Sequence, residues 1–166
     1  VGDVVEVQGP FGDAYWDGRK EAPLLLLAGG TGLAPMLSVL DAAIKEGQAA
    51  DQIHLYHGVR SERDLYASEY LQSWADQHGF RFVPVVVEGG GLRNGHLHDV
   101  VAQDFPDLSA AYIFTAGPPP MVDAVKALAS SRGAASHQIR ADAFFASEPE
   151  NKSKGLWGRL SKVFGA

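Results

Sequence analysis

The stretch Leu-Leu-Leu-Leu-Ala-Gly-Gly-Thr-Gly-Leu-Ala-Pro at residues 24–35 decides the fold of this chain. Its first part, 24–28, is an unbroken apolar run, which predicts a strand buried on both faces. The glycines after it predict a tight turn, and Pro35 suits the first position of a helix over 36–43. Residues 22–40 carry no charge, but their glycines and prolines favour strand, loop and helix over a membrane-spanning helix.

The same alternation continues along the chain. We predict further strands at 53–57, 82–87, 111–115 and 137–141, and further helices at 65–75, 97–102 and 121–130. Strands that alternate with helices form a parallel sheet with right-handed crossovers and helices on both faces. The sequence therefore predicts an α/β fold built on a doubly wound, five-stranded parallel sheet.

The two ends of the chain follow other patterns. Residues 4–8 alternate valine with polar residues, which predicts a short strand, and a lone strand needs a partner. We therefore expect 1–16 to be the last strand and exit of an upstream domain, and 17–147 to form the α/β domain. Residues 148–166 are expected to be a polar linker and a short amphipathic tail that docks on its own domain, with contact to an anionic membrane surface as the alternative.

Composition excludes several classes of function. The 166 residues suit one domain, and 46% hydrophobic with 20% charged residues is typical of a globular protein. The absence of cysteine removes disulfides, zinc fingers, thiolate nucleophiles and iron–sulfur ligands from this sequence. A net charge of -6 argues against nucleic acid as a partner. The N-terminus shows no signal-peptide pattern, so we expect a cytoplasmic protein.

Ligands of open parallel sheets bind outside the carboxyl ends of the strands, where the glycines and prolines of this sequence gather. The glycine turn after the first strand offers backbone N–H groups and a helix N-terminus, which suit a pyrophosphate. Its spacing, G-x-G-x-x-P, departs from the usual dinucleotide fingerprint. A tight turn without a ligand is the alternative, and the position of the turn in the chain favours a dinucleotide.

Two other chemistries find no support in the sequence. His96 and His98 are the one close histidine pair, and no third ligand stands at metal-binding spacing, so we expect no metal site. No serine has the G-x-S-x-G surroundings of a serine hydrolase.

Four motifs resemble the ferredoxin–NADP reductase superfamily. They are Gly-Pro-Phe-Gly at 9–12, Gly-Gly-Thr-Gly-Leu-Ala-Pro at 29–35, Gly-Val-Arg-Ser-Glu-Arg-Asp-Leu-Tyr at 58–66 and Ala-Gly-Pro-Pro-Pro-Met at 116–121. Within the superfamily, the chain is most similar to the flavin-dependent reductase components of bacterial ring-hydroxylating dioxygenases and monooxygenases. The resemblance covers residues 1 to about 147.

The resemblance implies a chain that holds NADH or NADPH, while FAD is bound by an upstream β-barrel. Hydride would pass from NAD(P)H to the flavin, for delivery to an electron acceptor such as ferredoxin, an iron–sulfur centre or an oxygenase. Transfer between two cofactors needs placement rather than an acid or base, so no catalytic side chain is expected. A regulatory module that binds a dinucleotide without transferring electrons is the alternative.

The resemblance also implies roles for particular residues of the binding edge. The pyrophosphate would lie against Gly30, Thr31 and Gly32, before the helix that carries Pro35. The adenosine ribose would lie near Arg60, Ser61 and Arg63, and the nicotinamide near Gly117, Pro118 and Met121. Phe144 and Phe145 would lie near the contact between nicotinamide and flavin. The alternatives are solvated charges for the arginines, and packing for Met121 and the two phenylalanines.

Two points stay open at this stage. The superfamily usually has a cysteine where this chain has Ala116, which removes a polarisable sulfur near the nicotinamide. The loop after the second strand contains Glu62 and Asp64, which suit a ribose 2′-hydroxyl, beside two arginines, which suit a 2′-phosphate. The subfamily resemblance favours NADH and the arginines favour NADPH.

Overall fold

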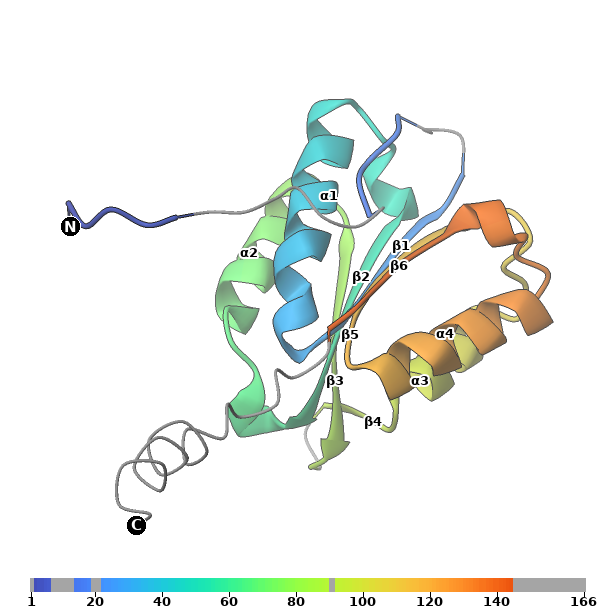
Figure 1. Ribbon diagram of the computed structural model, residues 1–166. Coiled ribbons are helices and arrows are strands. Elements are labelled where there is room, and N and C mark those ends of the chain that lie inside the picture. The colour runs from blue at the N-terminus through green and yellow to red at the C-terminus, as the bar shows by residue number, and fades with distance from the viewer. Residues whose placement is uncertain (1, 7–13, 19–21, 90–91, 145–166) are drawn as a thin grey trace, which may run out of the picture.

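The computed structural model describes residues 2–6, 14–18, 22–89 and 92–144, and it shows one parallel sheet (Figure 1). The strands are β1 (Leu24–Gly29), β2 (Ile53–Ser61), β3 (Arg81–Glu88), β4 (Arg93–Asn94), β5 (Tyr112–Gly117) and β6 (Ile139–Ala143). Their order in the sheet is β4-β3-β2-β1-β5-β6, and all five pairings are parallel. The predicted doubly wound sheet is confirmed, with six strands in place of five because the two-residue β4 extends one edge.

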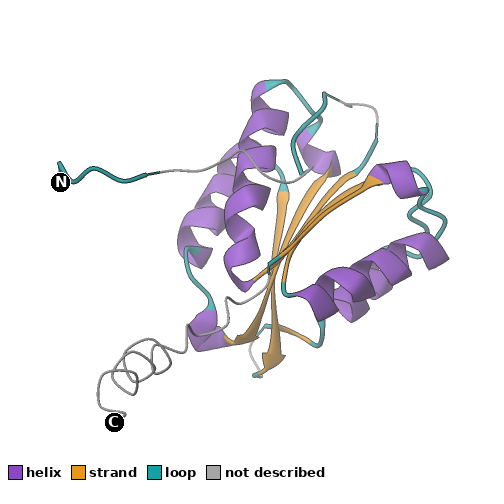
Figure 2. Ribbon diagram, viewed as in Figure 1, coloured by secondary structure: helices purple, strands orange, loops and turns teal. Residues whose placement is uncertain are grey.

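Helices cover both faces of the sheet (Figure 2). One face carries α1 (Leu33–Lys45) and α2 (Ser68–His78), and the other carries α3 (Leu97–Asp104) and α4 (Pro119–Ser131). The core is accordingly split into two clusters of buried apolar side chains, one under each helix pair. Every residue of β1 is buried, and its leucines alternate between the two clusters, as the apolar run predicted.

Several elements begin or end at other residues than the sequence predicted. The strand predicted at 53–57 continues to Ser61, because its last residues still pair with β3. The helix predicted from residue 65 begins at Ser68, since a 3-10 turn at Glu62–Asp64 comes first. Helix α1 begins at Leu33, so Pro35 occupies its third position rather than its first. A proline is tolerated there because the N–H groups of the first turn have no partner within the helix.

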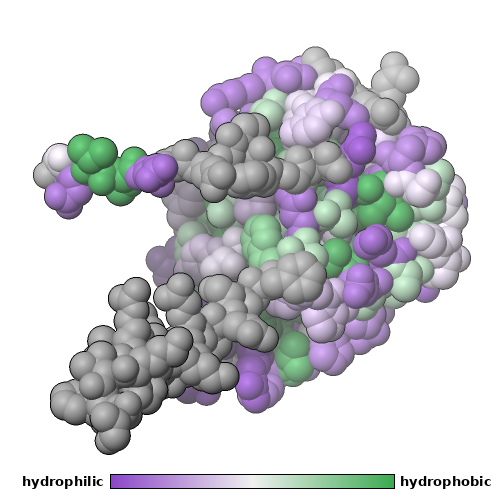
Figure 3. All heavy atoms as spheres, in the orientation of Figure 1, coloured by the Kyte–Doolittle hydropathy of each residue, from purple (hydrophilic) through white to green (hydrophobic). Residues whose placement is uncertain are grey.

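The N-terminal residues differ from the expectation of a strand over 4–8. Residues 4–6 belong to no strand, and residues 7 and 8 lie outside the described residues. Val4 and Val5 are 99% and 77% exposed, and residues 2–6 project from the body of the domain (Figure 3). Trp16 lies further along, where its indole N–H donates to the Glu46 carboxylate at 2.9 Å, next to the end of α1.

The predicted tail at 148–166 lies outside the described residues. Among the helices that the structure describes, none is long and apolar enough to cross a membrane.

Candidate functional site

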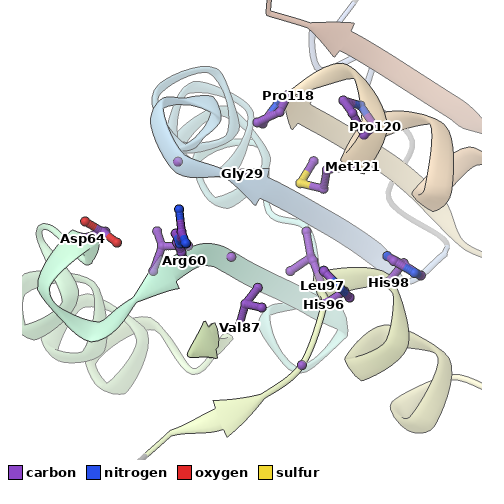
Figure 4. A pocket seen from close by; sticks show the side chains of 14 residues that line it. Gly29, Arg60, Asp64, Val87, His96, Leu97, His98, Pro118, Pro120 and Met121 are labelled. Atoms are coloured by element: carbon purple, nitrogen blue, oxygen red, sulfur yellow. The ribbon is translucent and has the colours of Figure 1, made fainter. Parts of the chain in front are cut away.

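A cavity opens at the carboxyl ends of the central strands. The connection from β1 leads to β2 on one side, whereas β5 lies on the other side of β1, so the chain connections diverge at the end of β1. Divergence of this kind leaves a crevice outside the sheet, where open α/β proteins bind ligands. The cavity here measures about 560 Å³ (Figure 4). It is lined by Gly29, Gly30, Gly58, Val59, Arg60, Asp64, Val87, Gly95, His96, Leu97, His98, Pro118, Pro120 and Met121.

The floor of the crevice is backbone. A Cβ atom on Gly32 would lie 1.9 Å from the carbonyl oxygen of Ala116, closer than any real contact. Gly117 has φ +151°, and a Cβ atom there would lie 2.9 Å from Cα of Gly29. The turn after β1 therefore touches the end of β5 directly, which only residues without a side chain permit. The backbone that a ligand can approach closely is that of Gly29 and Gly30, which line the cavity beside this contact.

The walls on the two sides of this floor differ in chemistry. The glycine turn, a 3-10 turn over Gly30–Gly32 that leads into α1, has no acidic residue and presents a helix N-terminus, which favours anions. Helix α4 begins with two prolines, which have no N–H, and the N–H of Met121 is bonded to the carbonyl of Pro118. The α4 wall is thus apolar, and the glycine turn is the side that suits a phosphate.

Charged side chains form the rim at the end of β2. The Nε of Arg60 lies 2.9 Å from a carboxylate oxygen of Glu88, and these side chains are 80% and 55% exposed. The Asp64 carboxylate accepts hydrogen bonds from the hydroxyl and the backbone N–H of Ser61, at 2.7 and 3.0 Å. The hydroxyl bond is the main reason that the pKa of Asp64 is lowered, so this carboxylate is ionised and acts as an acceptor.

The structure brings four of the predicted site residues to the cavity wall: Gly30, Arg60, Pro118 and Met121. The cavity lining does not include the other described residues of the predicted site, which are Thr31, Gly32, Pro35, Ser61, Arg63, Gly117 and Phe144. Phe144 donates its backbone N–H to the carbonyl of Gly117 at 2.9 Å and is 41% exposed. Phe145 lies outside the described residues. Ala116 is fully buried in the cluster under α1 and does not line the cavity.

One whole wall of the cavity is not among the residues predicted from the sequence. Residues 95–98, at the start of α3, line it together with Val87. The His96 and His98 rings stack with their centroids 5.6 Å apart. The described residues hold no group of three side chains that could bind a metal ion. The signal for this wall is Gly95, whose φ of +133° lets the chain turn from β4 into α3, but a two-residue strand leaves no visible pattern before it.

A doubly wound parallel sheet with a glycine turn and an apolar helix start at its central crevice defines an α/β dinucleotide-binding domain. The chain belongs to the oxidoreductase NAD-binding domain family, whose sequence profile matches residues 26–127. The resemblance to the ferredoxin–NADP reductase superfamily is thereby confirmed.

Two curated relatives are reductase components of dioxygenase systems. The ferredoxin–NAD(P)+ reductase component of the naphthalene 1,2-dioxygenase/salicylate 5-hydroxylase systems of Ralstonia is 40% identical over 151 residues, which cover 89% of this chain and 46% of that protein. The corresponding naphthalene 1,2-dioxygenase component of Pseudomonas putida is 37% identical, over 87% of this chain and 45% of that protein. The chain thus spans about half the length of these relatives.

Solved structures agree with this assignment. The cytochrome P450 reductase GcoB of Amycolatopsis is 32% identical with a TM-score of 0.76, over 84% of this chain and 44% of that one. The ferredoxin reductase of carbazole 1,9a-dioxygenase is 30% identical with a TM-score of 0.73, over 82% and 42% of the two chains.

Proposed function

We propose that this chain is the NAD(P)H-binding part of an FAD-dependent reductase. It would hold the nicotinamide nucleotide next to a flavin bound by an upstream domain, which passes electrons to a ferredoxin, an iron–sulfur centre or an oxygenase. The observation that carries the proposal is the crevice itself, whose glycine turn suits a phosphate and whose α4 wall suits an apolar ring. The names of the relatives, reductase components of such systems, support it. A cytoplasmic location, where NAD(P)H is supplied, belongs to the same proposal.

The residues of the crevice fit a dinucleotide. The turn at Gly30, Thr31 and Gly32 would bind the pyrophosphate through backbone N–H groups, at the start of the helix that carries Pro35. Across the crevice, Pro118 and Met121 offer an apolar surface for the nicotinamide, which supplies the hydride when bound, and Gly117 precedes them in the chain. Phe144 would stand on the flavin side. The chain contributes placement and the exclusion of water, so it needs no acidic or basic side chain.

The adenosine end would lie at the charged rim formed by Arg60, Ser61, Arg63 and Asp64. The ionised Asp64 lines the cavity and can accept a hydrogen bond from a ribose 2′-hydroxyl. Arg60 is already paired with Glu88, which weakens its attraction for a 2′-phosphate. We therefore propose that the site takes NADH in preference to NADPH.

Titration calorimetry of this chain with NADH, NADPH and ADP-ribose tests the nucleotide site. We expect NADH to bind more tightly than NADPH. Val87→Trp, which adds an indole at a cavity-lining position that is 40% exposed, should weaken binding strongly. Leu92→Trp is the matched control, because Leu92 is 38% exposed and does not line the cavity. Equal binding by the two variants would place the nucleotide elsewhere.

A second experiment separates the reductase from the regulatory alternative. In a protein that joins this chain to a flavin domain, anaerobic mixing with NADH should reduce the flavin, which loses its visible absorbance. Subsequent addition of an oxidised ferredoxin should restore that absorbance. Tight nucleotide binding with no loss of flavin absorbance would support the regulatory module instead.

A further inference from the structure

The carbonyl oxygen of Gly30 accepts more hydrogen bonds than the glycine turn needs. Within the 3-10 turn it accepts the backbone N–H of Leu33. It also accepts the Nε2–H of His57 and the hydroxyl of Tyr66, each at 3.1 Å. A carbonyl oxygen has two lone pairs, so three donors are more than one for each lone pair. The two side chains come from β2 and from the segment after the Glu62–Asp64 turn, far from Gly30 in the sequence.

Core packing does not explain why a histidine stands at position 57. Its side chain is fully buried, and its one hydrogen bond given by the described residues is the bond to Gly30. Because a carbonyl only accepts, Nε2 carries the proton, and Nδ1 is buried with no hydrogen-bond partner among the described residues. Burial lowers the pKa of His57, which agrees with a neutral ring. An unpaired buried nitrogen destabilises the fold, so an apolar side chain would pack there more favourably.

Tyr66 packs against His57 on the solvent side and bonds to the same carbonyl oxygen. Its ring stands edge-on to the His57 ring, with centroids 5.2 Å apart and an interplanar angle of 79°. The Tyr66 side chain is 44% exposed, so it covers His57 and still reaches the Gly30 carbonyl with its hydroxyl.

The hydrogen bonds fix the direction of one peptide group. In a trans peptide the carbonyl and the next N–H point in opposite directions. Gly30 has φ +52° and no side chain, so the peptide between Gly30 and Thr31 has a second accessible orientation. With the carbonyl bonded to His57 and Tyr66, the N–H of Thr31 points toward the N-terminal end of the turn. In the flipped orientation, the carbonyl oxygen would face an anion bound there and repel it.

We infer that His57 and Tyr66 are positioning residues that hold the Gly30–Thr31 peptide with its N–H directed at the phosphates of the bound nucleotide. They act through Gly30. The inference rests on the proposed function, because it requires the glycine turn to bind phosphate.

Binding of ADP and of adenosine tests the inference, since only ADP carries phosphates. His57→Leu removes the donor and the unpaired nitrogen together, so the variant should fold with unchanged or greater stability. It should still bind ADP about 5-fold more weakly, the equivalent of one hydrogen bond, while adenosine binding stays the same. Tyr66→Phe should weaken ADP binding by a similar or smaller factor. His57→Gln restores a donor at the same place and should recover part of the affinity. Tyr70→Phe is the control, because Tyr70 is 64% exposed and makes no described contact with Gly30.

The backbone amide signal of Thr31, followed by NMR without any ligand, separates this inference from the proposed function. In the double variant His57→Leu/Tyr66→Phe we expect this signal to shift or broaden, as the peptide samples its second orientation. An unchanged Thr31 signal, or a loss of affinity equal for ADP and adenosine, would overturn the inference. If the double variant shows the expected Thr31 response but the wild-type chain binds neither ADP nor NADH, the proposed function alone is overturned.

Discussion

The two sides of the crevice are built on different physical principles. Where β1 meets β5, backbone lies against backbone, and a Cβ atom on Gly32 would stand 1.9 Å from a carbonyl oxygen. Where β2 meets β3, exposed side chains of opposite charge meet in water, as Arg60 and Glu88 do. Close packing therefore fixes the backbone where β1 meets β5, which is the packed side. Where β2 meets β3, the exposed side, the charged side chains have little effect on stability. This division suits a dinucleotide, because NADH and NADPH share the same pyrophosphate and differ only at the adenosine ribose.

The largest expected effect is on the packed side. Gly32→Ala forces the end of β1 away from β5, because the new methyl group meets backbone rather than a flexible side chain. We expect a loss of at least about 3 kcal/mol in the free energy of unfolding, or failure to fold. Urea denaturation followed by circular dichroism measures this loss.

Gly30→Ala is the matched control in the same turn. No described atom lies within 4 Å of a Cβ at Gly30, so the methyl group has room, and only the left-handed backbone opposes it. That strain amounts to about 1–2 kcal/mol. Equal losses of unfolding free energy in the two variants would show that the cost of an alanine in this turn comes from backbone conformation and not from contact with β5.

An intermediate effect is expected at Asp104, at the end of α3. Its carboxylate accepts hydrogen bonds from the Tyr56 hydroxyl at 2.6 Å and from Arg81 and Arg93 at 3.0 Å each. The Asp104 side chain is 12% exposed, whereas that of Glu88 is 55% exposed. Asp104→Asn should therefore cost about 1–2 kcal/mol of stability, and Glu88→Gln within about 0.5 kcal/mol. Similar losses in the two variants would mean that burial does not distinguish these carboxylates.

The pH dependence of stability gives the Asp104 prediction a second readout. Burial acts to raise the pKa of Asp104, but hydrogen bonds from Tyr56 and Arg93 and the charge of Arg81 outweigh it and lower the pKa. In the unfolded chain, an aspartate carboxyl has a pKa of about 3.9. The stability from this group is thus present above that pH and is lost as the pH falls through the folded-state pKa. Between about pH 6 and about pH 3, the stability of Asp104→Asn should therefore fall less than that of the wild type, because the variant lacks this titrating group.

The sequence predicts the first strand and its glycine turn far better than the contacts that distant segments make with them. The apolar run at 24–28 and the glycines after it are local signals, and β1 and its turn lie where they predict. The same local signals do not show that His57, 27 residues from Gly30, reaches its carbonyl. Nor do they show that the chain before His96 forms a sixth strand, because β4 has two residues. Contacts between distant segments and very short strands leave no periodicity to read.

The smallest effect on stability is expected at the Arg60–Glu88 pair. The same pair should have the largest effect on the selectivity between NADH and NADPH. Arg60→Ala should leave the free energy of unfolding nearly unchanged, because both side chains are largely exposed. Glu88→Gln should leave NADH binding unchanged and strengthen NADPH binding several-fold, since the negative charge of Glu88 no longer offsets the attraction between Arg60 and a 2′-phosphate.

The ratio of the dissociation constants for NADH and NADPH, measured at two salt concentrations, checks this selectivity. The gain of Glu88→Gln should disappear in Arg60→Ala/Glu88→Gln, because the gain requires the guanidinium. It should also shrink at high salt, since exposed charges are screened within about 10 Å at 0.1 M ionic strength. The instability of Gly32→Ala depends on contact between backbones and should not respond to salt in this way. A salt-independent gain in NADPH binding would mean that the exposed side of the crevice is also shaped by packing.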